Sequence, residues 1–331
     1  MTVNKEKVVV IGWQPLSRRG ESFSHYIEAP FYLIHYLKFK YPPIAPIKYL
    51  LQGGKTMEIL LRERPGYLIV ENPPGVLPVL AYLYAKVFRA QFLIDAATGA
   101  FFDPRWKWMK PIFKFVSRRA FATIVTNNGL GEILTDWGSR PYILEDRIPS
   151  LPEASDFGLK KGFNIAVVNT FSFDEPVKEI LAAANLTPEA NFYITGNTAH
   201  ASKEMIAAAP SNVTFTGYLP DSDYYSLLRS AAAVMVLCTV DYTLCCGMYE
   251  AASLNKPLIA SDLSVVRAFF NRGTVHVRNT PEGISEGVRN TINQVDKLEE
   301  DMAQFRSERR IEWDQKCDSL LGMMKDKYVA R

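Results

Sequence analysis

Residues 217–262 read GYLPDSDYYSLLRSAAAVMVLCTVDYTLCCGMYEAASLNKPLIASD, and this segment decides the fold. Its pattern predicts a turn, a helix, a buried strand, a loop, a second helix and a second buried strand. Short apolar strands that alternate with helices are typical of a parallel sheet with helices on both faces. A single carboxylate, Glu250, stands just inside the second predicted helix.

This succession of strand ends and helix starts predicts a site for a phosphorylated ligand. A helix N-terminus offers free backbone N–H groups to a diphosphate, and a carboxylate beside it can hold ribose hydroxyls. We therefore interpret Glu250 as a ligand-binding residue. The alternative is a solvated glutamate, which the helix dipole favours near a helix start.

The rest of the chain repeats the strand–helix alternation on both sides of a polar, proline-containing linker, PSLPEASDFGLKK, at 149–161. Since 331 residues exceed one ordinary α/β core, we expect domains at 1–150 and 161–305 and a helical segment at 306–331. The pattern predicts strands at 8–11, 67–71, 92–95, 123–126, 164–168, 191–195 and 213–215. It predicts helices at 26–39, 76–88, 110–121, 129–137, 177–184, 203–208 and 311–328.

The composition is that of an ordinary globular protein. Hydrophobic residues make up 48% and charged residues 22% of the chain, and no apolar run approaches the ~20 residues of a membrane-spanning helix. The N-terminus enters a strand directly, so we expect no signal peptide. The cysteines Cys238, Cys245 and Cys246 crowd together, which favours reduced thiols in the cytoplasm over disulfides or a zinc site.

Charge is divided unevenly. Residues 1–150 carry 20 Lys and Arg against 12 Asp and Glu, whereas the remainder carries 18 against 23. In the basic half, 101–119 combines six aromatic residues and six cations with one acid, and 32–51 is similar. This composition favours an anionic membrane surface. The alternatives are an amphipathic helix with its aromatic residues in the core, and single-stranded nucleic acid, for which no motif is present.

The motif EAASLNKPLIASD, in which Glu250 lies seven residues before Pro257, resembles the nucleotide-sugar half of GT-B glycosyltransferases. Glu250 matches the second glutamate of the E-x7-E motif in the large retaining GT-B family. Tyr242, with Asp241 beside it, stands where the first glutamate is expected, so the sugar-contacting half of the motif is missing. The segments VVNTFSFDEP, ENPPGVLPVLAYLYAKVFRAQFLID and VTNNGLGEILTDWGSRPYILEDRIP are similar to the β-mannosyltransferase family that acts on dolichol-linked chitobiose.

The resemblance implies an α/β fold of the GT-B class, with two Rossmann-like doubly wound parallel sheets facing a cleft and 306–331 packed back on the first domain. It implies a UDP- or GDP-sugar donor in the second domain and no metal or other cofactor. The turn 217–219 would meet the base, with Tyr218 stacked on its ring, although such residues are also plain turn chemistry. The implied donor-binding residues are Asn169, Thr170, Ser172, Gly196, Asn197, Gly217, Tyr218, Leu219, Tyr242, Thr243, Leu244, Cys245, Cys246, Gly247 and Glu250.

The resemblance also places an active-site edge in the first domain. Related strands often end in D-x-H, whereas this strand ends at Asp95 with Ala97 in place of the histidine. Asp95 is the candidate base for an acceptor hydroxyl, or else a loop cap. Ala97 is a natural divergence or a deliberate substitution that disables the enzyme, and the intact loop around it favours substitution. The expected acceptor-binding residues are Ser17, Arg18, Arg19, Thr98 and Gly99.

Together these features predict a hexosyltransferase of polysaccharide or glycoconjugate biosynthesis, peripheral on the cytoplasmic membrane face. Its substrates would be a nucleotide sugar and a polyprenyl- or other lipid-linked glycan acceptor, with no nucleic acid involved. Two alternatives remain: a catalytically degenerate binding or scaffold subunit, motivated by Tyr242 and Ala97, and a GT-B sugar-nucleotide epimerase. The base, the sugar, the anomeric outcome, the acceptor and the oligomeric state stay open.

Overall fold

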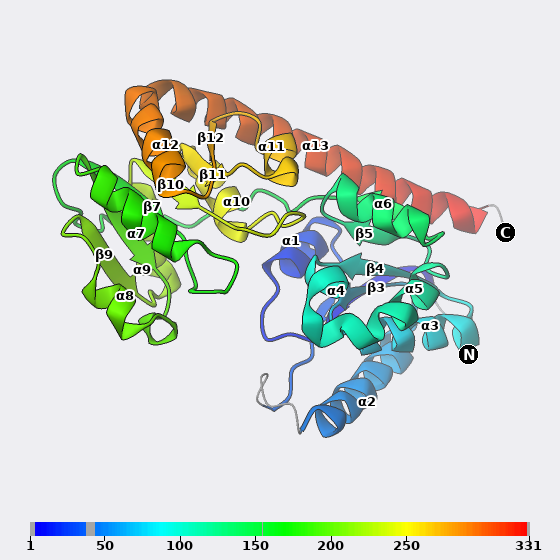
Figure 1. Ribbon diagram of the computed structural model, residues 1–331. Coiled ribbons are helices and arrows are strands. Elements are labelled where there is room, and N and C mark those ends of the chain that lie inside the picture. The colour runs from blue at the N-terminus through cyan, green and yellow to red at the C-terminus, as the bar shows by residue number, and fades with distance from the viewer. Residues whose placement is uncertain (1–3, 38–43, 154, 330–331) are drawn as a thin grey trace. The chain divides into compact units, whose positions relative to one another are not determined.

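The computed structural model describes residues 4–37, 44–153 and 155–329. The chain forms two compact units, the first of Met1–Arg147 with Trp313–Arg331 and the second of Ile148–Glu312. Each unit contains a six-stranded sheet in which every strand pair is parallel (Figure 1). The predicted α/β fold class is confirmed.

The first unit alternates strands with helices. Its strands are β1 (Asn4–Gly12), β2 (Phe31–Leu33), β3 (Pro65–Asn72), β4 (Gln91–Ala96), β5 (Thr123–Val125) and β6 (Pro141–Ile143). Its helices are α1 (Arg18–Tyr26), α2 (Ala45–Glu63), α3 (Val76–Phe88), α4 (Gly99–Phe102), the 3₁₀ helix η2 (Pro104–Met109), α5 (Lys110–Ser117) and α6 (Asn128–Asp136). The sheet order is β2-β1-β3-β4-β5-β6, and every residue of β3 is buried, as in a parallel sheet covered on both faces.

The second unit repeats this architecture. Its strands are β7 (Phe163–Val167), β8 (Ala190–Thr195), β9 (Val213–Gly217), β10 (Ala233–Val236), β11 (Leu258–Ser261) and β12 (Thr274–Val277). Its helices are α7 (Val177–Leu186), the 3₁₀ helix η3 (Thr198–His200), α8 (Lys203–Ala207), α9 (Asp221–Ser230), α10 (Cys246–Ser253), α11 (Ser264–Phe269) and α12 (Pro281–Asn293). The sheet order is β12-β11-β10-β7-β8-β9.

Each strand order contains one switch point. In the first unit the chain passes from β1 to β2 on one side and then to β3 on the other. In the second unit it passes from β7 through β8 to β9 and then returns to β10 on the opposite side of β7. Ligands of open α/β sheets bind outside the carboxyl ends of the strands at such points. The ends of β1 and β3, and of β7 and β10, are therefore where a site is expected.

Helix α13 (Val295–Val329) supplies core residues to both units. Met302 and Phe305 are buried in the second unit. The later part of the helix belongs to the first unit, where it buries Trp313, Cys317, Leu320 and Met324. These side chains pack with residues of β1, β3 and α1.

The predicted helix at 26–39 is wrong. Helix α1 ends at Tyr26, and residues 31–33 form the edge strand β2 beside β1. Glu28 has a φ of 52°, which takes the backbone out of the right-handed helical region, and the N–H of Val10 then donates to Pro30 O at 3.0 Å. Residues 38 and 39 of that prediction lie outside the described residues.

The structure also contains elements that the sequence pattern does not predict, namely α1, α2, α4, η2, β6, η3, α11, β12 and α12. Helix α2 carries adjacent glycines, Gly53 and Gly54, and its buried face includes Lys48, Gln52 and Thr56, so no continuous apolar stripe marks it in the sequence. The predicted helix at 110–121 ends earlier, at Ser117, because the chain turns back and the N–H of Phe121 donates to Phe92 O at 2.8 Å.

Candidate functional site

The loop after β7 lies at the switch point of the second unit and carries three predicted donor residues. Asn169 is buried, whereas Thr170 and Ser172 are exposed. The Glu175 carboxylate accepts hydrogen bonds from the N–H groups of Thr170 at 2.9 Å and Ser172 at 2.8 Å, and from Thr170 Oγ1 at 3.1 Å. The backbone donors of this loop are therefore already turned toward an anionic group.

Gly196 follows the last residue of β8 and packs against the loop after β7. Its φ is 108°, and a Cβ at this position would lie 2.5 Å from the carbonyl oxygen of Asn169. Only glycine fits such a backbone. The Asn169 N–H donates to Thr195 Oγ1 at 3.0 Å, so the predicted residues Asn169 and Gly196 lie together. Asn197, the next residue, accepts from the Ala199 N–H at 3.0 Å and caps η3.

Helix α10 begins at the same switch point. Cys245 precedes the helix, and Cys246 and Gly247 belong to its first turn. A Cβ at Gly247 would lie 2.9 Å from Val168 Cγ1, so this turn packs directly against the end of β7. The first N–H groups of a helix have no partner within it, and its N-terminus carries partial positive charge. Such an arrangement is suited to a diphosphate.

Glu250 lies on α10 and is buried, with 4% of its surface exposed. Tyr224 Oη, on α9, donates a hydrogen bond to Glu250 Oε2 at 2.5 Å. The alternative of a solvated glutamate is therefore wrong. A buried carboxylate needs hydrogen-bond partners, and Tyr224 holds this one in place. The sequence analysis does not identify Tyr224, whose signal is a tyrosine in the first turn of the helix after the 217–219 turn.

The turn after β9 carries the residues predicted to meet the base. Gly217 has a φ of 74°, and a Cβ there would meet nothing within 4 Å. Tyr218 is 77% exposed, so its ring is accessible for stacking. Leu219 is half-buried against the core of the unit. The structure places these residues at the carboxyl end of the sheet.

The loop before α10 carries the remaining predicted donor residues. Tyr242 is exposed and has a φ of 69°, whereas Thr243 and Leu244 are half-buried. Asp241 accepts hydrogen bonds from Ser264 Oγ at 2.6 Å and from the Tyr242 N–H at 2.8 Å. The carboxylate beside the missing glutamate position therefore ties this loop to the start of α11.

The clustered cysteines are free thiols. Cys238 and Cys245 share a hydrogen bond. This bond lowers the pKa of the buried Cys238 and raises the pKa of Cys245. Among residues 4–37, 44–153 and 155–329, no group of three or more His, Cys, Asp or Glu side chains is placed to hold a metal ion. A pocket of about 260 Å³ lies between the loops after β7 and β8 and includes Ser172, Glu175 and Lys178.

The switch point of the first unit is filled by Glu71, at the end of β3. Glu71 is 6% exposed and lies in register with Asp95 on β4. Its carboxylate accepts hydrogen bonds from Ser17 Oγ and from Gln14 Nε2, the latter at 2.8 Å. Burial, followed by the negative charge of Asp95, raises the pKa of Glu71 to about 7, although the two hydrogen bonds and Arg19 oppose the shift.

Arg19, predicted to bind the acceptor, is engaged within the protein. Its Nε lies 2.9 Å from Asp95 Oδ2 and 3.0 Å from Oδ1, and its Nη1 lies 2.5 Å from Asp146 Oδ1. Its Nη2 donates to Leu144 O at 2.9 Å. Asp95, the predicted base, is therefore one partner of a partly buried ion pair. Ser17 is the N-cap of α1 and accepts from the Gly20 N–H at 3.0 Å.

The other predicted residues of the first unit lie around these ends. Ala97 is exposed, and its N–H donates to Asn72 O at 2.9 Å. Thr98 and Gly99 are half-buried at the start of α4, and Arg18 is half-buried at the start of α1. An imidazole at position 97 would thus extend into solvent.

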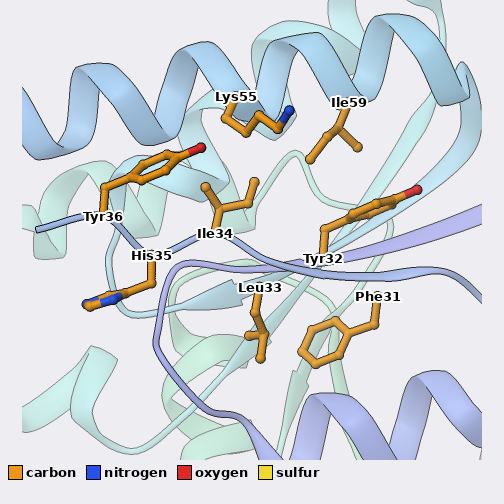
Figure 2. Close-up of a pocket in the computed structure, with 8 residues that line it drawn as sticks. All are labelled: Phe31, Tyr32, Leu33, Ile34, His35, Tyr36, Lys55 and Ile59. Atoms are coloured by element: carbon orange, nitrogen blue, oxygen red, sulfur yellow. The ribbon is translucent and has the colours of Figure 1, made fainter.

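The first unit has a pocket of about 320 Å³ between α2 and β2 with the residues that follow β2 (Figure 2). Figure 2 shows Lys55 and Ile59 on α2, with Ile34 below them. Lys55 Nζ pairs with Glu58 Oε1 at 2.7 Å. None of the predicted site residues lines this pocket.

The basic aromatic segment 101–119 divides between core and solvent. Phe101 and Phe113 are buried, whereas Trp108 is 64% and Phe115 46% exposed. Helix α2 adds Leu50, which is 76% exposed. The interpretation of aromatic residues in the core therefore holds for Phe101 and Phe113, whereas membrane binding by the exposed residues stays a prediction. Within the part of the chain that the structure describes, no helix is both long enough and apolar enough to cross a bilayer.

Comparison with known proteins agrees with this geometry. Residues 155–309 match the family model of the glycosyl transferases group 1. No curated protein matches the sequence. The fold is similar to that of sucrose-phosphate synthase (tll1590) from Thermosynechococcus elongatus, with a TM-score of 0.75 and 10% identity over 98% of this chain and 100% of that chain.

Two further solved structures have the same fold. Anabaena HepE in complex with UDP and glucose has a TM-score of 0.71 and 11% identity over 96% of this chain and 99% of that chain. The E. coli structure described as trehalose-6-phosphate bound with UDP-2-fluoro glucose has a TM-score of 0.73 and 9% identity over 96% and 99%. The predicted GT-B architecture, with a parallel sheet in each unit, is confirmed.

Proposed function

We propose that the chain transfers a sugar from a nucleoside diphosphate sugar to a lipid-linked glycan acceptor. The match of residues 155–309 to the group 1 glycosyltransferase model and the GT-B fold support this proposal. The observation that carries the proposal is Glu250, which is buried on α10 and accepts a hydrogen bond from Tyr224 of α9. The N-terminus of α10 lies at the switch point. A carboxylate so placed suits ribose hydroxyls beside a bound diphosphate.

The donor is assigned to the second unit. The diphosphate lies at the first turn of α10, the ribose at Glu250, and the base at 217–219 with Tyr218 on its face. UDP is the first candidate, because HepE and the E. coli structure hold UDP or a UDP-sugar. Backbone N–H groups supply the positive potential, so we propose that transfer requires no metal ion.

The acceptor is assigned to the first unit and to a membrane surface. Residues 1–150 carry the excess of cations, and Trp108 and Leu50 are exposed among them. Exposed aromatic and aliphatic side chains next to cations bind the interface of an anionic bilayer. We therefore propose peripheral attachment to the cytoplasmic face, with a polyprenyl-linked acceptor presented from the bilayer.

Calorimetric titration with UDP and GDP tests the donor assignment. We expect one of them to bind the wild type, and we expect Glu250→Gln to weaken binding about tenfold or more, because the amide cannot accept from both ribose hydroxyls. Glu204→Gln, at an exposed carboxylate of α8, is the matched control and should bind like the wild type. If neither nucleotide, alone or as its sugar conjugate, binds the wild type, the donor assignment is wrong.

A catalytically degenerate binding subunit is the second candidate, favoured by Ala97 and by the Arg19–Asp95 ion pair. Ala97→His distinguishes the two, because the exposed position accepts an imidazole without a clash. Turnover of a UDP-sugar by the wild type, or by Ala97→His alone, supports the transferase. Binding without turnover by either protein, with a polyprenyl phosphate acceptor present, supports the binding subunit.

A further inference from the structure

We propose that Glu71, with Ser17 as the bridge, takes the proton of the acceptor hydroxyl; this inference rests on the proposed transfer. Glu71 is the penultimate residue of β3 and lies at the switch point, next to the end of β1. A Cβ at Gly12 or at Gly20 would collide with its carboxylate oxygens. The two glycines therefore leave the space at the ligand-binding edge in which this carboxylate lies.

The hydrogen bonds around Glu71 leave a route for a proton. Ser17 Oγ donates to Glu71 Oε1 and accepts from the Gly20 N–H at 3.0 Å. A hydroxyl oxygen has two lone pairs, so Ser17 retains one that can accept from a bound hydroxyl. Gln14 Nε2 holds the other carboxylate oxygen at 2.8 Å and fixes the carboxylate plane. The arrangement orients one oxygen toward Ser17.

The two carboxylates at this edge of the sheet have different hydrogen-bond and charge partners. Arg19 from α1 pairs with Asp95 from β4, which neutralises that carboxylate. Glu71 receives neutral donors, and the charged groups that act on it are Asp95 and Arg19, with opposite effects. Its pKa of about 7 makes Glu71 an acceptor of protons near neutral pH.

The step conserves atoms and charge. The acceptor oxygen forms a bond to the anomeric carbon while the bond from that carbon to the diphosphate oxygen breaks. The nucleoside diphosphate leaves with the electron pair. The acceptor proton passes to Ser17 Oγ as the Ser17 proton passes to Glu71, which afterwards releases it to solvent.

The test compares Glu71→Gln with the parent protein, either the wild type or Ala97→His if only that variant transfers sugar. Glu63→Gln is the control, since Glu63 belongs to the same unit and pairs with Lys7 at 2.6 Å. We expect the kcat of the parent to rise with pH through about 7, because ionised Glu71 is the active form. Glu71→Gln should lose about 100-fold or more in kcat together with that rise, with UDP affinity unchanged.

A structural contribution of the same residues would give another result. Ser17→Ala removes the bridge and also the N-cap of α1, whereas Ser17→Thr keeps the hydroxyl, so threonine should restore kcat and alanine should not. If Glu71→Gln only lowers the melting temperature and keeps the kcat and pH profile of the parent, the inference is overturned. If neither parent transfers sugar, the proposed function fails first, which the parent's own assay reveals.

Discussion

In both units the loop after the first strand is closed by a glutamate, but the surroundings differ. In the second unit Glu175 belongs to the loop itself, is partly exposed and receives backbone N–H groups. In the first unit Glu71 comes from a neighbouring strand, is buried and receives the side chains of Ser17 and Gln14. The same residue type thus orders a loop in one unit and titrates near neutral pH in the other, because solvation and partners set its chemistry.

The largest effect is expected from the glycines beside these loops. Gly196→Ala should destabilise the second unit by about 3 kcal/mol or more, because its φ is positive and the added Cβ meets backbone that cannot move aside. Gly12→Ala meets side chains and no backbone, namely Glu71 and, at 3.1 Å, Leu33 Cδ2, so adding Glu71→Ala should relieve part of its cost. Urea denaturation followed by circular dichroism measures both, and an undiminished midpoint for Gly196→Ala would contradict the assigned backbone.

The next effect concerns the pH dependence of the first unit. The pKa of Glu71 is raised from 4.5 to about 7 in the folded state, so its stabilising contribution is complete below pH ~4.5 and is lost as the pH rises through 7. Relative to Glu71→Gln, the wild type should lose up to about 3 kcal/mol of unfolding free energy between pH 4.5 and 8. All five tryptophans belong to the first unit, so their fluorescence reports this unit.

Glu63→Gln gives the opposite sign and serves as the control for this titration. Hydrogen bonds from Lys7, Arg62 and Tyr32 lower the pKa of Glu63 to about 2. Its contribution is therefore present above pH ~4.5 and is lost as the pH falls toward 2. Equal pH dependence of the two variants would mean that the surroundings of Glu71 do not raise its pKa.

Membrane binding extends the comparison to the surfaces of the two units. Trp108→Ala combined with Leu50→Ser should reduce cosedimentation with phosphatidylserine vesicles about tenfold, since both side chains are exposed within the basic unit. Phe173→Ala is the matched control, because this aromatic residue is 91% exposed in the second unit. An equal loss for Phe173→Ala would contradict attachment through the first unit.

The smallest effect is expected from Glu175→Gln. The variant keeps the shape of the loop but replaces a charged acceptor of the Thr170 and Ser172 N–H groups by an amide oxygen. We expect a loss of about 1 kcal/mol in the unfolding free energy of the second unit. Urea denaturation followed by circular dichroism measures it, and an unchanged midpoint would show that the charge of Glu175 adds nothing to these hydrogen bonds.

Regular elements with strong patterns are predicted well from the sequence. The helix predicted at 76–88 has the same bounds as α3, because its apolar residues are bounded by Gly75 and by Arg89 in the left-handed region. The interval 26–39 fails because a strand of three residues carries too few alternations to be distinguished from a helix. Its strand character depends on pairing with β1, which no local pattern contains.

The residues of the candidate site also fall into two groups, those that the sequence identifies and those that only the structure identifies. Glu250 stands out because its flanking motif is contiguous in the sequence, and the structure places it at the switch point of the second unit. The sequence does not single out Glu71, because the residues that act on it are Ser17, 54 residues away, and Asp95 on the next strand. The engagement of Arg19 by two carboxylates is equally a product of tertiary structure.

Helix α13 has a consequence for the order in which the chain folds. Trp313, Cys317, Leu320 and Met324 complete the core of the first unit, yet they follow all of Ile148–Glu312 in the chain. The ribosome therefore makes the whole second unit before it makes these core residues of the first. Until then the first unit cannot close its core, and part of its apolar interior stays exposed during synthesis.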